Sequence, residues 1–257
     1  MQISAVSKEV SEWSGSVLIA GVLEGTKESQ LNLFKSIIEN TYLSQRFKDA
    51  KFEGKKNQKL SIELIKGKIK KIIFIGLGEA ENLLIDDLRK AASIGTRQVC
   101  GYKGTVGIFF PWDAFEPSSA AFAVGEAVRL TNFKDLRFKS EPNEFAQIDE
   151  VELIGLDTKT TKSAIAEINP ICEGVKFARE LVSAPPNFLT PYQMAKEAEN
   201  LATDYDLDLK ILDKKECKDQ GMGAYLAVAK GSDLEPKFIH LKYSPKTAKN
   251  RIVLIGK

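Results

Sequence analysis

Short apolar runs rich in β-branched residues alternate with segments of helical periodicity along most of this chain. Such a run, bounded by glycine or proline, is typical of a buried strand. Strands separated by helices indicate crossover units, which build a mostly parallel sheet with helices on its faces. In the first half we expect strands at residues 15–23, 70–78, 104–110 and 150–156. The fold class is therefore predicted to be α/β.

The segments between these strands carry apolar residues at helical spacing. The clearest case begins at Leu83 and places Leu84, Leu88 and Ile94 on one stripe. We expect helices at residues 29–40, 83–100 and 118–131.

The character of the chain changes near residue 160. Asn169 and Pro170 have the residue types of an N-cap followed by proline at the first helical position. The polar segment upstream of them, DTKTTKS, is the best candidate for a joint between domains. We expect residues 1–157 to form an N-terminal domain, residues 158–184 a bridging helix, and residues 185–257 the start of a catalytic domain.

The second half again predicts alternating helices and strands. Thr190, Pro191 and Gln193 fit a capping box with proline in the first turn, and Asp213 with Glu216 fits another. Further strands are expected at residues 206–212, 237–243 and 251–256. Because sheets average about five or six strands, the second domain is expected to be incomplete.

Composition excludes several classes of protein. The 37 basic and 35 acidic residues give a net charge of +2, which is too balanced to imply nucleic acid binding. The basic run at 66–71 is interpreted as a solvated flank of a strand.

No membrane span or secretory signal is seen, so a cytoplasmic location is expected. Cys100, Cys172 and Cys217 are odd in number and widely spaced, which argues against disulfides and against a thiolate metal site.

Four local features have a structural and a functional interpretation. IGLGEAEN at residues 75–82 lacks the third glycine of a dinucleotide fingerprint, and its acidic residues would repel a pyrophosphate, so a structural turn is favoured. The missing glycine also weakens the case that the chain is a nicotinamide-dependent dehydrogenase.

His240 is expected to be packed or hydrogen-bonded. The glycines of residues 221–233 are expected to belong to a tightly packed turn and strand. Trp13 and Trp112 are expected to be core or interface anchors.

Three stretches of the second half carry a family resemblance: ELVSAPPNFLTPYQMA, GMGAYLAVAKGSDLEPKFIHLKY and RIVLIGK. With them, the sequence closely resembles the leucyl (cytosol) aminopeptidases, and KIIFIGLGEAENLLIDDLRKAASIGTR in the first half resembles that family more loosely. The resemblance implies a macro-domain-like N-terminal domain, a bridging helix and an α/β metallopeptidase catalytic domain. It also implies removal of N-terminal residues, preferably leucine, from peptides, two divalent metal ions (Mn²⁺ or Zn²⁺) and a homo-hexamer.

The resemblance assigns Lys257 as a metal ligand. In the family a glycine and an Asp-Ser-Gly-Gly turn follow this lysine, and the remaining ligands and catalytic groups lie further downstream. An ammonium has no lone pair, so a lysine must lose its proton before it can bind a metal. We therefore expect residues 1–257 alone to be inactive and to bind metal poorly.

A non-catalytic binding module is the alternative. A macro-like domain could hold a nucleotide-type ligand, and some aminopeptidases of this family bind DNA. The acidic turn at residues 79–81 and the near-neutral charge argue against both ligands.

Overall fold

The computed structural model describes residues 1–26, 28–99, 104–141 and 148–256. It divides into two compact units, Met1–Arg179 (unit 1) and Glu180–Lys257 (unit 2). The division falls inside the predicted bridging segment 158–184, whose bounds stay a prediction. None of the helices in the described residues is long and apolar enough to cross a membrane.

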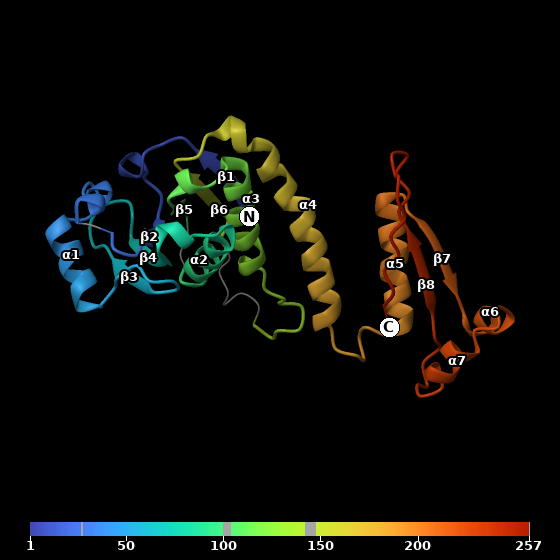
Figure 1. Cartoon of the computed structure of the whole chain (residues 1–257). Helices are drawn as coiled ribbons and strands as arrows, with labels where there is room; N and C mark the ends of the chain where they lie inside the picture. The colour runs from blue at the N-terminus through green and yellow to red at the C-terminus, as the bar shows by residue number, and fades with distance from the viewer. Residues whose placement is uncertain (27, 100–103, 142–147, 257) are drawn as a thin grey trace. The chain divides into compact units, whose positions relative to one another are not determined.

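Unit 1 is built on a six-stranded sheet with the order β1-β6-β5-β2-β4-β3 (Figure 1). Neighbouring strands are parallel except β3, which pairs with β4 in the antiparallel sense. The α/β prediction is confirmed. The strands are β1 (Gln2–Val6), β2 (Val17–Leu23), β3 (Lys59–Glu63), β4 (Lys71–Gly78), β5 (Thr105–Phe109) and β6 (Glu150–Ile154).

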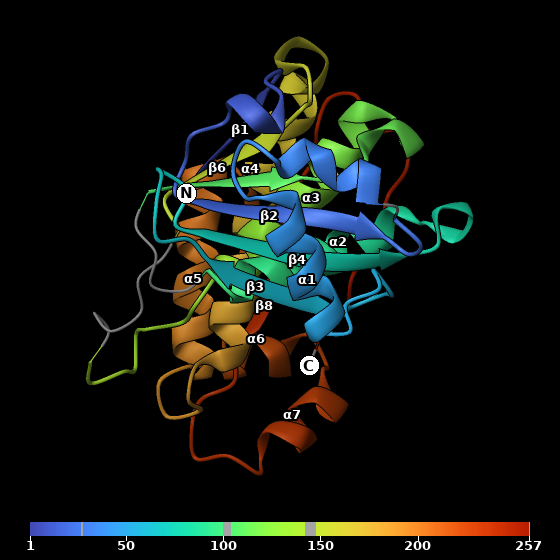
Figure 2. The ribbon, with the colours of Figure 1, turned by 90° about the vertical axis from the view of Figure 1, so that its left-hand side faces the viewer.

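The helices of unit 1 cover both faces of this sheet (Figure 2). On one face, α2 and α3 bury small and apolar side chains; on the other, α1 and the 3₁₀ turn η2 do so. The helices are α1 (Asn40–Asp49), α2 (Ile85–Arg97), α3 (Pro117–Asn132) and α4 (Thr158–Ser183), of which the residues from Glu180 onward are assigned to unit 2. The 3₁₀ turns are η1 (Val10–Glu12), η2 (Glu28–Phe34), η3 (Ala80–Asn82) and η4 (Trp112–Ala114).

The central strands are apolar on both sides because both sides are covered. Along β4, Ile72 and Phe74 enter the cluster under α1, whereas Ile73 and Ile75 enter the cluster under α2 and α3. Successive side chains of a strand point to opposite faces, so a strand buried on both faces reads as a continuous apolar run. This is why the sequence predicts β2, β4 and β5 well.

Two strands of the sheet were missing from the sequence prediction. β1 pairs with β6, and β3 pairs with β4, so both lie at the edges of the sheet. The burial of β3 alternates between its two faces, with Leu60 and Ile62 buried and their neighbours exposed. Edge strands with one solvated face carry a weaker apolar signal than central ones.

The helix predicted at residues 29–40 is wrong. The chain forms the 3₁₀ turn η2 up to Phe34, continues in turns, and enters α1 only at Asn40. Leu31 and Phe34 are both buried, and their spacing of three matches a 3₁₀ turn, in which positions i and i+3 eclipse. The apolar residues therefore reach the core without an α-helix.

The predicted helix start at Asn169 and Pro170 is also wrong. The helix α4 begins at Thr158, and Pro170 lies inside it with an exposed side chain. The carboxylate of Asp157 accepts the Thr160 N–H at 2.8 Å, so the polar run that we interpreted as a joint starts the helix. Proline removes one helical hydrogen bond, and the burial of Ile168 and Cys172 within unit 1 offsets that loss.

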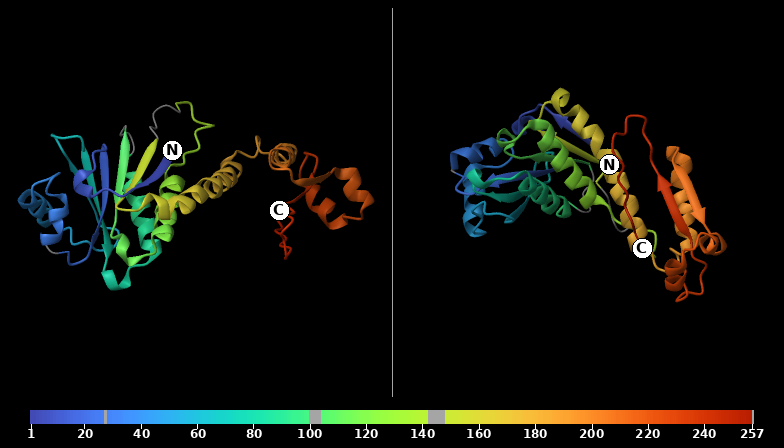
Figure 3. Two further views of the ribbon diagram at one scale, coloured as in Figure 1. Left: turned by 90° about the horizontal axis from the view of Figure 1, so that it is seen from above. Right: turned by 45° about the vertical axis from the view of Figure 1, so that its right-hand side comes forward.

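Unit 2 packs one helix on a two-stranded antiparallel sheet (Figure 3). The helix α5 (Pro191–Tyr205) contacts β7 (Asp208–Leu212) and β8 (Phe238–Lys242). Two short helices, α6 (Lys214–Asp219) and α7 (Gly223–Ala229), lie between these strands in the sequence.

The predicted capping box is confirmed in full at α6 but only in its Thr190 half at α5, where the Thr190 N–H donates to the Phe188 carbonyl at 3.1 Å. The Thr190 hydroxyl accepts the Gln193 N–H at 3.2 Å, with Pro191 in the first turn. Asp213 and Glu216 form a reciprocal capping box.

The packed turn and strand predicted at residues 221–233 is wrong, because these residues form α7 and its flanks. A Cβ added at Gly221 or Gly223 would meet nothing within 4 Å. These two glycines are therefore not required by close packing in this structure, although Gly221 has a left-handed φ of +73°.

Candidate functional site

The residue that the sequence assigns to a metal centre, Lys257, lies outside the described residues. The six residues before it, 251–256, have no regular secondary structure, so the strand predicted there is wrong in this structure. Leu254 is 93% exposed and Ile255 94% exposed. A strand needs a neighbour to accept its backbone hydrogen bonds, and in the described residues β7 and β8 pair only with each other.

The described residues do not provide a set of metal ligands. No group of three or more His, Cys, Asp or Glu side chains comes together among them. His240 is exposed on β8, so its predicted packing is wrong. Cys172 and Cys217 are buried free thiols, and burial raises the pKa of both, whereas Cys100 lies outside the described residues.

The glycines of residues 75–82 lie at the end of β4 and have a structural role, as predicted. A Cβ on Gly76 would lie 2.0 Å from the Lys55 carbonyl oxygen, so only glycine lets the chain at 54–55 approach β4. Gly78 has a φ of +83° and donates its N–H to the Gly54 carbonyl at 2.8 Å. These contacts use both glycines for close packing and backbone hydrogen bonding within unit 1.

A groove of about 820 Å³ opens where three parallel strands of unit 1 end. Its wall includes Leu23 at the end of β2, Phe109 at the end of β5 and Gly155 just after β6. Beyond β2 the chain leads to η2 and α1 on one face of the sheet, and beyond β5 it leads to α3 on the other. Adjacent strands whose connections leave to opposite faces open a crevice at their carboxyl ends, the usual place for ligands in open α/β sheets.

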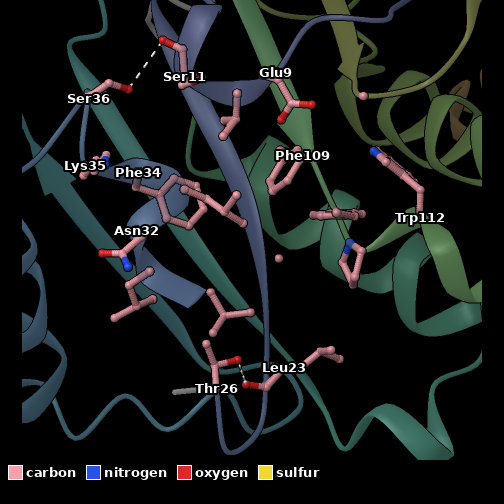
Figure 4. Close-up of a pocket in the computed structure, with 18 of the residues that line it drawn as sticks. Glu9, Ser11, Leu23, Thr26, Asn32, Phe34, Lys35, Ser36, Phe109 and Trp112 are labelled. Atoms are coloured by element: carbon pink, nitrogen blue, oxygen red, sulfur yellow. Dashed lines mark hydrogen bonds between the residues drawn. The ribbon is translucent and has the colours of Figure 1, made fainter. Parts of the chain in front are cut away.

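The floor of the groove is aromatic (Figure 4). The rings of Phe34 and Phe109 meet edge to face with centroids 6.2 Å apart. Trp112 is 7% exposed and donates its Nε1–H to the Ile154 carbonyl at 2.6 Å, which fixes the ring beside Gly155. The predicted anchoring role of Trp112 is thereby confirmed. Trp13 is likewise buried and donates its Nε1–H to the Glu152 carboxylate at 2.7 Å.

The rim of the groove is polar. Exposed side chains of both charges lie along it, together with hydroxyl and amide groups: Lys8, Glu9, Ser11, Thr26, Asn32, Lys35, Ser36 and Asp113. The Ser36 hydroxyl lies 3.4 Å from the Ser11 carbonyl, and the Thr26 hydroxyl donates to the Leu23 carbonyl at 2.6 Å.

Sequence reasoning missed this groove because its parts come from three distant segments. The signal that would have located the groove is the order of the strands, because the ends of adjacent parallel strands meet at one edge of a sheet. That order follows from pairing, which no local pattern reveals.

Models of one family match both halves of the chain. The N-terminal domain of the cytosol aminopeptidase family matches residues 19–142, and its catalytic domain matches residues 176–257. Among curated relatives, a probable cytosol aminopeptidase of Prochlorococcus marinus (strain MIT 9211) is 49% identical over 258 aligned residues, and one of Synechococcus sp. (strain CC9311) is 39% identical over 261. Each alignment covers 100% of this chain and 52% of the relative, so the chain spans about half the length of these relatives.

Solved structures agree with these matches. A mutant of tomato leucine aminopeptidase superimposes with a TM-score of 0.86 at 27% identity, covering 98% of this chain and 52% of that one. The bottromycin maturation enzyme BotP, in complex with Mn, superimposes with a TM-score of 0.70 at 22% identity, covering 90% of this chain and 46% of its own, and shows likeness of fold alone. With both halves matched in order by its domains, this chain belongs to the cytosol aminopeptidase family.

Proposed function

We propose that this chain is the N-terminal part of a metal-dependent aminopeptidase that releases N-terminal residues, preferably leucine, from peptides. The observation that carries the proposal is the match of both family domains in order, with the catalytic domain represented by residues 176–257. The names of the curated relatives and of the tomato enzyme support the same activity.

The proposed cofactor is a pair of divalent metal ions, Mn²⁺ or Zn²⁺, with Lys257 as one ligand. The complex of BotP with Mn supports a divalent metal of this kind in a related fold. In the family that the sequence resembles, the remaining ligands and the catalytic groups follow this lysine, so we propose that they lie in residues after Lys257. Accordingly, no catalytic step is assigned to a described residue.

The first test compares the longer protein with residues 1–257. We expect the longer protein to hydrolyse leucine anilide when manganese is added, and residues 1–257 to show no turnover. Sequencing beyond codon 257 should reveal a glycine and an Asp-Ser-Gly-Gly turn. Robust turnover by residues 1–257 would contradict the proposal that this part is incomplete.

The second test concerns Lys257 itself. In the longer protein, Lys257→Met should weaken metal binding at least about tenfold, the range found when metal sites lose a supporting group, and activity should fall with it. Lys249→Met removes an exposed lysine a few residues earlier and should leave metal binding unchanged. Equal metal affinity in the two variants, measured by titration, would show that Lys257 is not a ligand.

We further propose that the longer protein acts in the cytoplasm as a homo-hexamer on peptide substrates. Sedimentation of the purified longer protein tests the assembly. A nucleotide- or DNA-binding module is not favoured by the family match, and titration with ADP-ribose and with duplex DNA at low salt would detect it.

A further inference from the structure

We propose that the groove at the carboxyl ends of β2, β5 and β6 binds a short peptide with apolar side chains and free, charged ends. The groove belongs to unit 1, whereas Lys257 belongs to unit 2. Binding in the groove therefore does not depend on the proposed metal chemistry.

The floor of the groove suits apolar side chains. Phe34 and Trp112 are buried in unit 1 and present only part of their rings to the groove, while Phe109 is half-buried. The edge-to-face contact of Phe34 with Phe109 and the hydrogen bond of Trp112 hold these rings in place. A rigid aromatic floor favours apolar groups because little side-chain freedom is lost on binding.

The rim suits a ligand with one positive and one negative end. Lys8 and Lys35 supply positive charge, and Glu9 and Asp113 supply negative charge. All four side chains are exposed, and within the described parts of the chain none of them has an ion-pair or hydrogen-bond partner. A peptide ammonium can pair with a rim carboxylate while its carboxylate pairs with a rim lysine, which is the charge complementarity expected of a specific site.

A phosphate-bearing ligand fits this groove less well. The helix that follows β5 is α3, and its first N–H groups already have an anion: Glu116 accepts those of Ser118 and Ser119 at 3.0 and 2.7 Å. Pro111, which lines the groove, has no N–H to offer. The carboxylates of Glu9 and Asp113 balance the two rim lysines, so the rim has no net positive charge that would favour a phosphate.

The size of the groove agrees with a di- or tripeptide. Its volume of about 820 Å³ lies inside the range of about 300–1,000 Å³ found for small-molecule pockets.

Calorimetric titration of residues 1–257 with the dipeptide Leu-Phe tests the proposal. We expect binding with one site per chain, accompanied by a change in tryptophan fluorescence, because Trp112 lines the groove. The same dipeptide blocked by N-acetylation and C-amidation should bind at least about tenfold more weakly, since both charged ends are lost.

Variants locate the site. Glu9→Gln combined with Asp113→Asn should weaken binding of free Leu-Phe at least about fivefold and leave the blocked dipeptide unchanged, because only the free ammonium needs these carboxylates. Glu12→Gln is the matched control. Glu12 is exposed at the end of η1, the 3₁₀ turn that begins directly after Glu9, and it does not line the groove. It should bind both peptides as the unaltered chain does.

Three results would overturn the proposal. They are the absence of Leu-Phe binding, equal binding of the free and blocked dipeptides, and equal binding by the double variant and the control. Displacement of Leu-Phe by AMP at lower concentration than by a second peptide would instead assign the groove to nucleotides. Lys257→Met should not change Leu-Phe binding to the groove, so failure of the proposed metal site and failure of this proposal are distinguishable.

Discussion

Unit 1 and unit 2 follow the same α/β pattern but differ in how much apolar surface they bury. Unit 1 has a cluster of buried side chains on each face of its six-stranded sheet. In the described part of unit 2, the buried apolar side chains are few and mostly small: Ala195, Ala198, Leu212, Cys217 and Pro236. Many larger ones are exposed, among them Tyr243 at 73%.

The difference shows that a correct local pattern does not by itself produce a closed core. A sheet covered on both faces removes nearly every strand side chain from water, and burial of that apolar area is the main favourable term in folding. In unit 2 a two-stranded sheet has α5 packed on it and most of its strand side chains are only partly buried or exposed, so less apolar area is removed from water. We therefore expect unit 1 to be the more stable part of the molecule.

The largest effect should come from emptying the core of unit 1. Phe74 is fully buried and its ring contacts those of Phe34 and Phe47, so Phe74→Ala should lower the free energy of unfolding by about 3–5 kcal/mol. Phe238→Ala removes a ring that is 37% exposed in unit 2 and should cost less than about 1.5 kcal/mol.

Each unit has its own readout for this test. Both tryptophans, Trp13 and Trp112, lie in unit 1, so urea unfolding followed by tryptophan fluorescence reports that unit. Hydrogen exchange of the β7 amides reports unit 2. Similar losses for the two phenylalanine variants would remove the contrast between the units.

A second contrast uses two glycines with opposite surroundings. Gly76→Ala would place a Cβ against the backbone at Lys55 and should destabilise unit 1 by about 1–3 kcal/mol. Gly174 lies inside α4 with nothing within 4 Å of an added Cβ, so Gly174→Ala should stabilise by about 0.5–1 kcal/mol. Thermal unfolding of both variants checks the opposite signs, and a loss at both positions would contradict the open environment of Gly174.

In unit 2, the N-cap of α6 should contribute measurably to stability although the buried core of this unit is small. Asp213→Ala removes the acceptor for the Glu216 N–H, a bond of 2.8 Å, and should cost about 1 kcal/mol. Asp219→Ala, an exposed residue at the other end of α6, makes no such bond and serves as the control. Faster hydrogen exchange of the α6 amides in Asp213→Ala alone is the expected result.

The smallest effect concerns pH and unit 1. The N–H groups of Ser118 and Ser119 lower the pKa of the Glu116 carboxyl below its ordinary 4.5. Its contribution to stability is therefore complete above the unfolded pKa and is lost as the pH falls through the lower folded value. Glu116→Gln keeps an acceptor oxygen but cannot titrate, so the loss of stability below about pH 4.5 should become shallower.

Glu39→Gln is the control for this titration. Glu39 occupies the N-cap position of α1 but makes no capping bond with its side chain. Its acid unfolding, followed by tryptophan fluorescence, should match that of the unaltered chain. If the loss of stability at low pH became shallower in both variants, the hydrogen bonds that Glu116 accepts at the start of α3 would not be the cause of that loss.

The quality of the sequence prediction followed the degree of burial. The strands β2 and β4 were predicted because both faces are covered, whereas the edge strands β1 and β3 were missed. Pro170 misled the helix prediction because packing of α4 on unit 1 overrides the local cost of a proline. At residues 251–256 the apolar pattern predicted a strand, but the described residues offer it no pairing partner.

The two candidate sites also differ in how far the sequence could predict them. Lys257 could be named only from a family motif, and it lies outside the described residues. The groove of unit 1 could not be predicted from any motif, because segments near residues 9, 34 and 112 meet only through the strand order.

The sequence alone determined the fold class, the central strands, the caps of α5 and α6 and the family, because periodicity, capping and family motifs are written in neighbouring residues. The tertiary structure alone decided the order of the strands, the start of α4 and the aromatic groove. Those features depend on which distant segments pack together, and the free energy of that packing is not contained in any local stretch of the chain.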